Sequence, residues 1–178
     1  MTTIEVARHG MAALLEDDDA AAFDAIEWRR AQRPASGVVT DASDVRMMVE
    51  ILRRFGGHAA AALLGGRFRP SAGGETMIEV GVGVGYDAAD RSTTCSSELY
   101  RRFIVGLPDE FADGVMDGLL TGELLPAGVL TIDRAGFSEI DSSAIAFRLT
   151  ADLLVTALAA RLAGESVEDA ARNVVSSW

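Results

Sequence analysis

Apolar residues in the first third of the chain recur at a spacing that we interpret as helical. Residues 4–15 are rich in Ala and Leu, and residues 17–33 begin with acidic and end with basic side chains, an order that favours the helix dipole. Val45, Met48, Val49 and Leu52 then follow an i, i+3, i+4, i+7 pattern. We therefore predict helices for most of residues 1–57.

The remaining two thirds of the chain alternates between strand-like and helix-like patterns. Apolar residues over 75–86, 97–106 and 128–132 are typical of strands. Pro108, followed by two acidic residues, predicts a helix start, and Gly122 predicts its end. We expect an α+β fold with an N-terminal helical segment at 1–57 and an α/β domain at 58–178.

Two further helices are predicted near the C-terminal end. Asp141, Ser142 and Ser143 form a capping sequence for the longest helix, which reaches about residue 161 and is closed by Gly164. Ser166 begins a short final helix. Helix-face spacing predicts that five residues are buried against the sheet: Phe111, Val115, Leu119, Phe147 and Leu154.

Charge and composition narrow the function classes. The 178 residues carry 16 basic side chains, all Arg, and 27 acidic ones, for a net charge of −11. Such acidity disfavours a broad, sequence-independent grip on nucleic acid, so we expect no free-DNA partner. A single cysteine and two histidines leave few ways to build a metal site, and we expect no metal and no cofactor. No signal peptide and no apolar run of about 20 residues is found, which predicts a cytoplasmic protein without a membrane partner.

We interpret three short motifs as structural features and not as functional sites. Arg8-His9-Gly10 is similar to a phosphohistidine motif, but no matching downstream motif follows, so we expect His9 on a helix surface. The glycines at 81–85 do not follow the dinucleotide fingerprint, and without Lys the chain has no phosphate loop, so we predict no GTP or ATP binding. Cys95 lies in a polar stretch without a neighbouring base, and we expect a loop thiol.

A longer pattern begins at Gly106. It has the acidic helix start after Pro108, a helix with glycines at 118 and 122, a strand, and then Asp141-Ser142-Ser143-Ala-Ile-Ala-Phe-Arg. With the loop Arg-Phe-Arg-Pro-Ser-Ala-Gly-Gly at 67–74, this stretch resembles domain IV of translation elongation factor G and its relatives, including the ribosomal protection proteins. The resemblance covers roughly residues 66–163.

The resemblance implies a β-α-β-α layer of the ribosomal protein S5 domain 2 type, with two loops at one tip that enter the decoding site of the small ribosomal subunit. By residue match, the implied tip-loop residues are Ser71, Gly73, Gly74, Arg134, Gly136, Phe137, Ser138 and Glu139. Ser138 stands where the family commonly has His, and Glu75 stands where it has a basic residue. The family's GTPase domain is absent from this sequence, so driven translocation is not expected of this chain alone.

Three hypotheses follow. The first is a non-enzymatic, stand-alone protein like domain IV, acting as an accessory in translation through contact with the ribosome or a factor. The alternative is a homo-oligomeric protein-interaction module that uses the same fold in an unrelated pathway. The third is an enzyme with a cleft beside the sheet, for which no catalytic residue is assigned.

Overall fold

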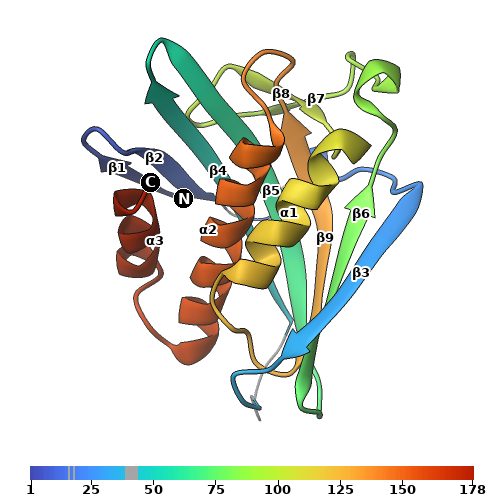
Figure 1. Ribbon diagram of the computed structural model, residues 1–178, viewed down its shortest axis with the longest axis vertical. Helices are drawn as coiled ribbons and strands as arrows, with labels where there is room; N and C mark the ends of the chain where they lie inside the picture. The colour runs from blue at the N-terminus through green and yellow to red at the C-terminus, as the bar shows by residue number, and fades with distance from the viewer. Residues whose placement is uncertain (16, 18, 39–43) are drawn as a thin grey trace.

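A computed structural model describes residues 1–15, 17, 19–38 and 44–178, and a curled, mostly antiparallel sheet runs through it (Figure 1). Within the described residues, nine strands follow the order β1-β2-β4-β5-β9-β6-β3, with β8 pairing on β9 and β7 on β8. Their bounds are β1 Thr2–Val6, β2 Gly10–Leu15, β3 Glu27–Pro34, β4 Val45–Phe55, β5 His58–Pro70, β6 Glu75–Val82, β7 Thr94–Ser96, β8 Arg102–Val105 and β9 Gly128–Phe137. Among these described strands, only β6 and β9 pair in parallel.

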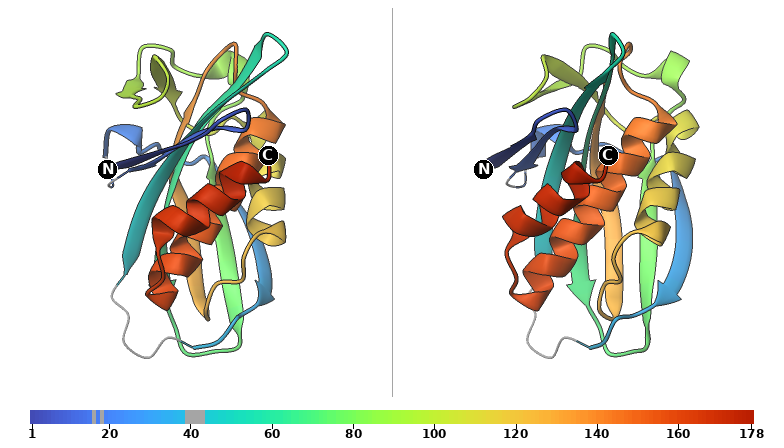
Figure 2. Two further views of the ribbon diagram at one scale, coloured as in Figure 1. Left: turned by 90° about the vertical axis from the view of Figure 1, so that its left-hand side faces the viewer. Right: turned by 60° about the vertical axis from the view of Figure 1, so that its left-hand side comes forward.

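Three helices cover one face of this sheet (Figure 2): α1 (Asp109–Thr121), α2 (Ala144–Ala163) and α3 (Val167–Ser176). The helix predictions for this half are confirmed, caps included. The Ser143 and Ser166 side chains accept bonds from the backbone N–H groups three residues on, and Gly164 closes α2 with φ 71°. Among the described residues, no helix is long and apolar enough to cross a membrane.

Helices α1 and α2 approach closely because α1 presents glycines to α2. A Cβ atom at Gly118 would lie 2.3 Å from the carbonyl oxygen of Arg148, and one at Gly114 would lie 2.1 Å from that of Ala144. The predicted core is confirmed at four of its five positions, since Val115, Leu119, Phe147 and Leu154 are fully buried. Phe111 is partly buried and stacks on Phe147.

The predicted N-terminal helices are wrong. Apart from a 3-10 turn, η1 (Asp19–Ala21), the described elements of residues 1–57 are strands of the same sheet, and the predicted boundary at 57/58 falls in the β4–β5 turn. The cause is clearest in β4, which is buried on both faces. Met47, Val49 and Ile51 face the helices while Met48 and Leu52 face the other side, so a strand shows a helix-like run of apolar residues.

The face away from the helices has its own smaller core, which is covered by Cys95 of β7 and by Leu99 and Tyr100 of the turn that follows it. The short turn η2 (Tyr86–Ala88) packs instead against the core on the helical side, through Tyr86. Cys95 lies in β7 and is 3% exposed, so it is a buried strand residue and not the predicted loop thiol. It packs with Met48, Leu63 and Phe103. This covering segment is what buries the second face of β4 and β5.

A buried carboxylate holds this segment in place. Glu50 of β4 is fully buried and accepts hydrogen bonds from the Ser97 hydroxyl and from the backbone N–H groups of Glu98 (2.9 Å) and Leu99 (3.1 Å). Burial raises the pKa of Glu50, and these hydrogen bonds oppose the shift. Glu50 therefore acts as a structural anchor for the turn that follows β7.

Candidate functional site

The structure places the two implied tip loops at opposite ends of β9. Ser71, Gly73 and Gly74 lie in the β5–β6 connection, beside the start of β9, because Pro70 pairs with Gly128. Ser138 and Glu139 follow the other end of the strand. Ten residues of β9 separate the loops by about 30 Å at the usual strand rise. The structure therefore does not bring them together into one tip.

Arg134 was the cation implied for the tip loop, but the structure places it in an internal cluster of ion pairs. Its residue is 8% exposed, and its guanidinium contacts carboxylate oxygens of Asp17 (3.1 Å), Asp19 (2.7 Å) and Asp133 (3.1 Å). Arg46 joins the cluster through two hydrogen bonds to Asp133, which are the largest cause of the raised pKa of Arg46. Arg134 is thus neutralised within the chain and does not present a charge to phosphates.

A β-bulge makes this cluster. The register between β5 and β9 shifts so that Gly66 pairs with Ile132 and Gly65 with Arg134, leaving Asp133 as the extra residue. Consecutive residues of a regular strand face opposite sides, but the bulge lets Asp133 and Arg134 reach the same partners. The sequence pattern carries no signal of this register shift.

The other implied tip residues also have structural partners. Phe137 is fully buried in the core, and the backbone of Gly136 lies against Phe103, where a Cβ atom would approach to 2.7 Å. The Ser138 hydroxyl accepts backbone N–H bonds from the turn after β9, and Glu139 forms an ion pair with Arg91. These residues shape one end of the sheet.

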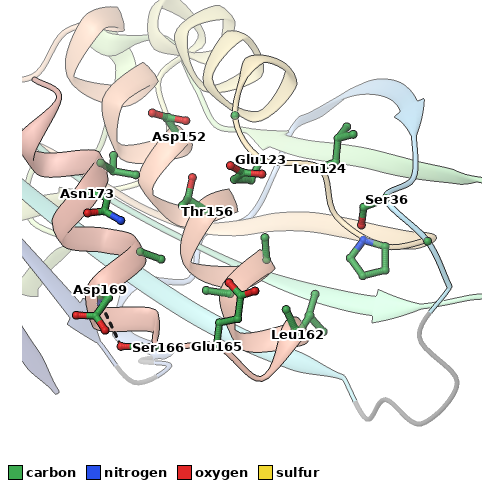
Figure 3. Close-up of a pocket in the computed structure, with 18 of the residues that line it drawn as sticks. Ser36, Glu123, Leu124, Asp152, Thr156, Leu162, Glu165, Ser166, Asp169 and Asn173 are labelled. Atoms are coloured by element: carbon green, nitrogen blue, oxygen red, sulfur yellow. Dashed lines mark hydrogen bonds between the residues drawn. The ribbon is translucent and has the colours of Figure 1, made fainter.

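A groove of about 1090 Å³ lies on the helical side (Figure 3). Its floor is a stripe of α2 made of the half-buried Asp152, Thr156 and Ala159 and the exposed Ala163. These positions follow i, i+4, i+7 and i+11, so they lie along one side of the helix. The stripe is about 17 Å long at 1.5 Å per residue, enough for three helical turns.

Two walls enclose this stripe. One wall is α3, which contributes Ser166, Asp169 and Asn173. The other is the connection from α1 to β9, with Glu123 and Leu124, joined by the 36–38 segment after β3. The small floor residues allow close approach of a partner backbone.

The second wall is tied down from the sheet. The guanidinium of Arg33, on β3, donates to the carbonyl oxygens of Leu119 and Gly122 (2.8 Å) at the end of α1. Burial lowers the pKa of Arg33, and Glu123 opposes that shift. The backbone N–H of Ser36 bonds the Leu125 carbonyl at 2.9 Å. These hydrogen bonds fix the second wall of the groove to the sheet.

The groove carries charge of one sign. Glu123, Asp152, Glu165 and Asp169 line it, and no Arg or His does among the described residues. None of the four forms an ion pair in the described part of the chain. The pKa of Asp152 is raised, chiefly by burial and further by Glu123, while Arg148 lowers it. This arrangement attracts cations.

The other titratable candidates lie in structural contacts. His9 is in the β1–β2 turn, not on a helix as predicted, and its Nδ1 lies 2.9 Å from the Trp178 carbonyl oxygen. Asp109 and Asp113 of α1 both pair with Arg29 of β3. Among the described residues, no group of three or more His, Cys, Asp or Glu side chains is arranged to hold a metal ion.

Sequence reasoning missed the groove because its carboxylates are scattered from position 123 to position 169. Each of them, taken alone, has the pattern of an ordinary surface residue. The four floor residues of α2 give no distinct signal either, because Arg148, Thr150 and several further alanines occur elsewhere along the same helix.

Comparison with known proteins places few constraints on identity. No protein-family model matches the chain, and no curated protein matches it. Among solved structures, a protein from Thermus thermophilus is similar, with a TM-score of 0.42 and 13% sequence identity over 72% of this chain. The chain spans 16% of the length of that protein. A likeness at this level does not assign the chain to a fold family.

Proposed function

We propose that this chain is a non-enzymatic protein-interaction module whose groove over α2 receives a basic segment of a protein. The observation that carries the proposal is the pairing of shape and charge: a groove of about 1090 Å³ lined by four carboxylates and by no Arg or His of the described residues. Opposite charge along a groove selects partners and accelerates their encounter.

The floor of the groove supports a peptide occupant over a small molecule. Thr156, Ala159 and Ala163 offer a shallow, weakly polar strip with no deep apolar pocket beneath it. A peptide lying between α3 and the α1–β9 connection would direct its basic side chains at the carboxylates of the two walls. Leu124 and Val174 provide apolar contacts for its underside.

The test uses a fluorescent 12-residue helical peptide with three Arg on one face and Ala on the other, titrated at 50 mM salt. Binding to the wild-type protein is expected, with affinity falling about fivefold to tenfold in Glu123→Gln/Glu165→Gln, because each exposed charge pair contributes up to about 1 kcal/mol. A peptide with Gln in place of Arg should not bind.

The matched control is Glu5→Gln/Glu27→Gln, which removes the same charge from exposed positions on β1 and β3, outside the groove. This variant should keep at least half the wild-type affinity. An equal loss in both double variants would show attraction to net charge alone, and the docking proposal would fall.

A translational accessory is the second candidate, favoured by the order β8-α1-β9-α2 in the stretch that resembles domain IV. Exposed Arg69, near the β5–β6 connection, is the cation best placed to test it, since Arg134 is engaged internally. Co-sedimentation with 30S and 70S particles at low and physiological salt, for wild type and Arg69→Glu, decides the question. No pelleting at low salt, or pelleting unchanged by Arg69→Glu, would reject contact through that loop.

A further inference from the structure

We infer that the basic segment received by the groove is the β4–β5 arm of a second copy of this chain, so that copies associate head to tail. This inference rests on the proposed function and names its partner. The arm is defined here as residues 54–58, the exposed end of the β4–β5 hairpin.

The arm stands clear of the sheet. Strand β2 pairs with β4 only as far as Leu52, and β9 pairs with β5 only from Ala62. Residues 53–60 therefore pair only with each other among the described strands. Figure 2 shows the hairpin end projecting at the top of both views, beyond the helices.

The tip of the arm is narrow. Gly56 and Gly57 form its two-residue turn with φ of 53° and 83°, the conformation of a type I′ hairpin. Glycine leaves no side chain at the tip, and two paired strands lie about 4.8 Å apart. The tip can therefore approach another surface with its backbone.

The charge of the arm is opposite to that of the groove. Arg54 is exposed on the arm and supplies its positive charge. No carboxylate occurs between Glu50 and Glu75, which is the longest acid-free stretch of the chain. Most arginines on the rest of the sheet are tied to carboxylates, as Arg29, Arg30, Arg46, Arg67 and Arg134 show. The arm is thus the projecting cationic segment of an acidic protein.

Arm and groove are different surfaces, so the contact is heterologous. Each copy offers one arm and one groove, and association continues into chains or closes into a ring. Nucleic acid is the competing occupant for a basic arm. We favour a second copy because the net charge of −11 repels phosphate, whereas the groove supplies four carboxylates to the same cations.

Sedimentation velocity of the full chain from 1 to 200 µM, at 50 and 500 mM salt, tests the inference. The wild type should associate with concentration at low salt and dissociate at high salt. Arg54→Glu and Glu165→Arg should each weaken association at least tenfold. Their equimolar mixture, or the double variant, should restore it, because each charge reversal then meets its opposite.

Arg101→Glu is the matched control, since it makes the same charge change at an exposed position outside the arm and should leave association unchanged. Circular dichroism melts verify that every variant is folded. A wild type that stays monomeric while the basic peptide still binds the groove would overturn self-docking and leave the proposed function standing. Binding of a fluorescent 20-nucleotide RNA that Arg54→Glu abolishes, without self-association, would reassign the arm to nucleic acid.

Discussion

Two groups of carboxylates in this molecule have opposite surroundings. On the side away from the helices, Asp17, Asp19 and Asp133 surround Arg134, and Arg46 completes the cluster. On the helical side, the groove carboxylates have no ion-pair partner among the described residues. The carboxylates around Arg134 form ion pairs that stabilise the fold. The groove carboxylates destabilise the fold only slightly and remain available to bind a cationic partner. This contrast is our main reason for placing function over α2.

Among the substitutions that test this comparison, replacement of Arg134 should change the free energy of unfolding most. Arg134→Ala leaves Asp17 and Asp133 without their partly buried partner, and we expect the free energy of unfolding to fall by about 3 kcal/mol. Urea unfolding measures the change. Exposed Arg101→Ala should shift it by less than about 0.5 kcal/mol. A small effect at Arg134 would show that the cluster is not structural and would remove one side of the comparison.

Substitution of Glu50 is a second test of the sheet face away from the helices. Glu50→Ala leaves the hydroxyl of Ser97 and two backbone N–H groups without an acceptor, with an expected loss of about 2 kcal/mol. Glu50→Gln, which keeps an acceptor, should lose less and serves as its control.

The raised pKa of Glu50 also predicts how the contribution of this residue to stability changes with pH. Its pKa is raised in the folded chain, so protonation favours folding, and stability contributed by this group is lost as pH rises through the raised pKa. Lowering the pH from 7 towards 5 should therefore increase the stability of the wild type relative to Glu50→Gln. A difference that does not change with pH would contradict a carboxylate shifted by burial.

Moving a wall of the groove should have an intermediate effect. In Gly118→Ala the new methyl group would meet the carbonyl oxygen of Arg148, forcing α1 away from α2, and we expect a loss of about 2 kcal/mol with weaker peptide binding. Gly37→Ala is the control in the 36–38 segment, where a Cβ atom has nothing within 4 Å. Equal melting temperatures for the two variants would refute the close α1–α2 contact.

The smallest effect, with the opposite sign, is expected at the groove floor. Asp152→Asn removes a half-buried charge that faces Glu123, and it should raise stability at pH 7 by a few tenths of a kcal/mol after allowance for solvent screening. In the wild type, peptide binding should weaken as pH falls through the raised pKa of Asp152. The Asn variant should bind more weakly at pH 7 and with a flatter pH profile, as fluorescence titration would show.

Local chemistry explains which parts of the fold could be predicted. Pro108, Ser143, Gly164 and Ser166 act on their immediate neighbours, and each marks the helix end that the sequence indicated. Strand β4 was mistaken for a helix because its second face is buried by residues that lie far along the chain: Cys95, Leu99, Tyr100 and Phe103. The spacing of apolar residues along a segment indicates how many of its faces are buried. It does not indicate which other segments bury them.

The candidate site was less accessible for the same reason. Arg134 was assigned to a tip because its partners Asp17 and Asp19 lie more than a hundred residues earlier. The strand it belongs to also runs on to Phe137, beyond the five residues predicted, and this separates the two implied loops. A groove assembled from the end of α1, the middle of α2 and α3 has no contiguous sequence signature.

The bulge at Asp133 has a consequence for how the chain can change in length. Loss of one residue from a regular strand turns every following side chain to the opposite face. Here Ile132 already pairs with Gly66 and Arg134 with Gly65, so a chain without Asp133 would resume the regular ladder with Arg134 to Phe137 on their present faces. Position 133 is thus a point in the centre of the sheet where evolution can add or remove a residue and lose a carboxylate without scrambling the core.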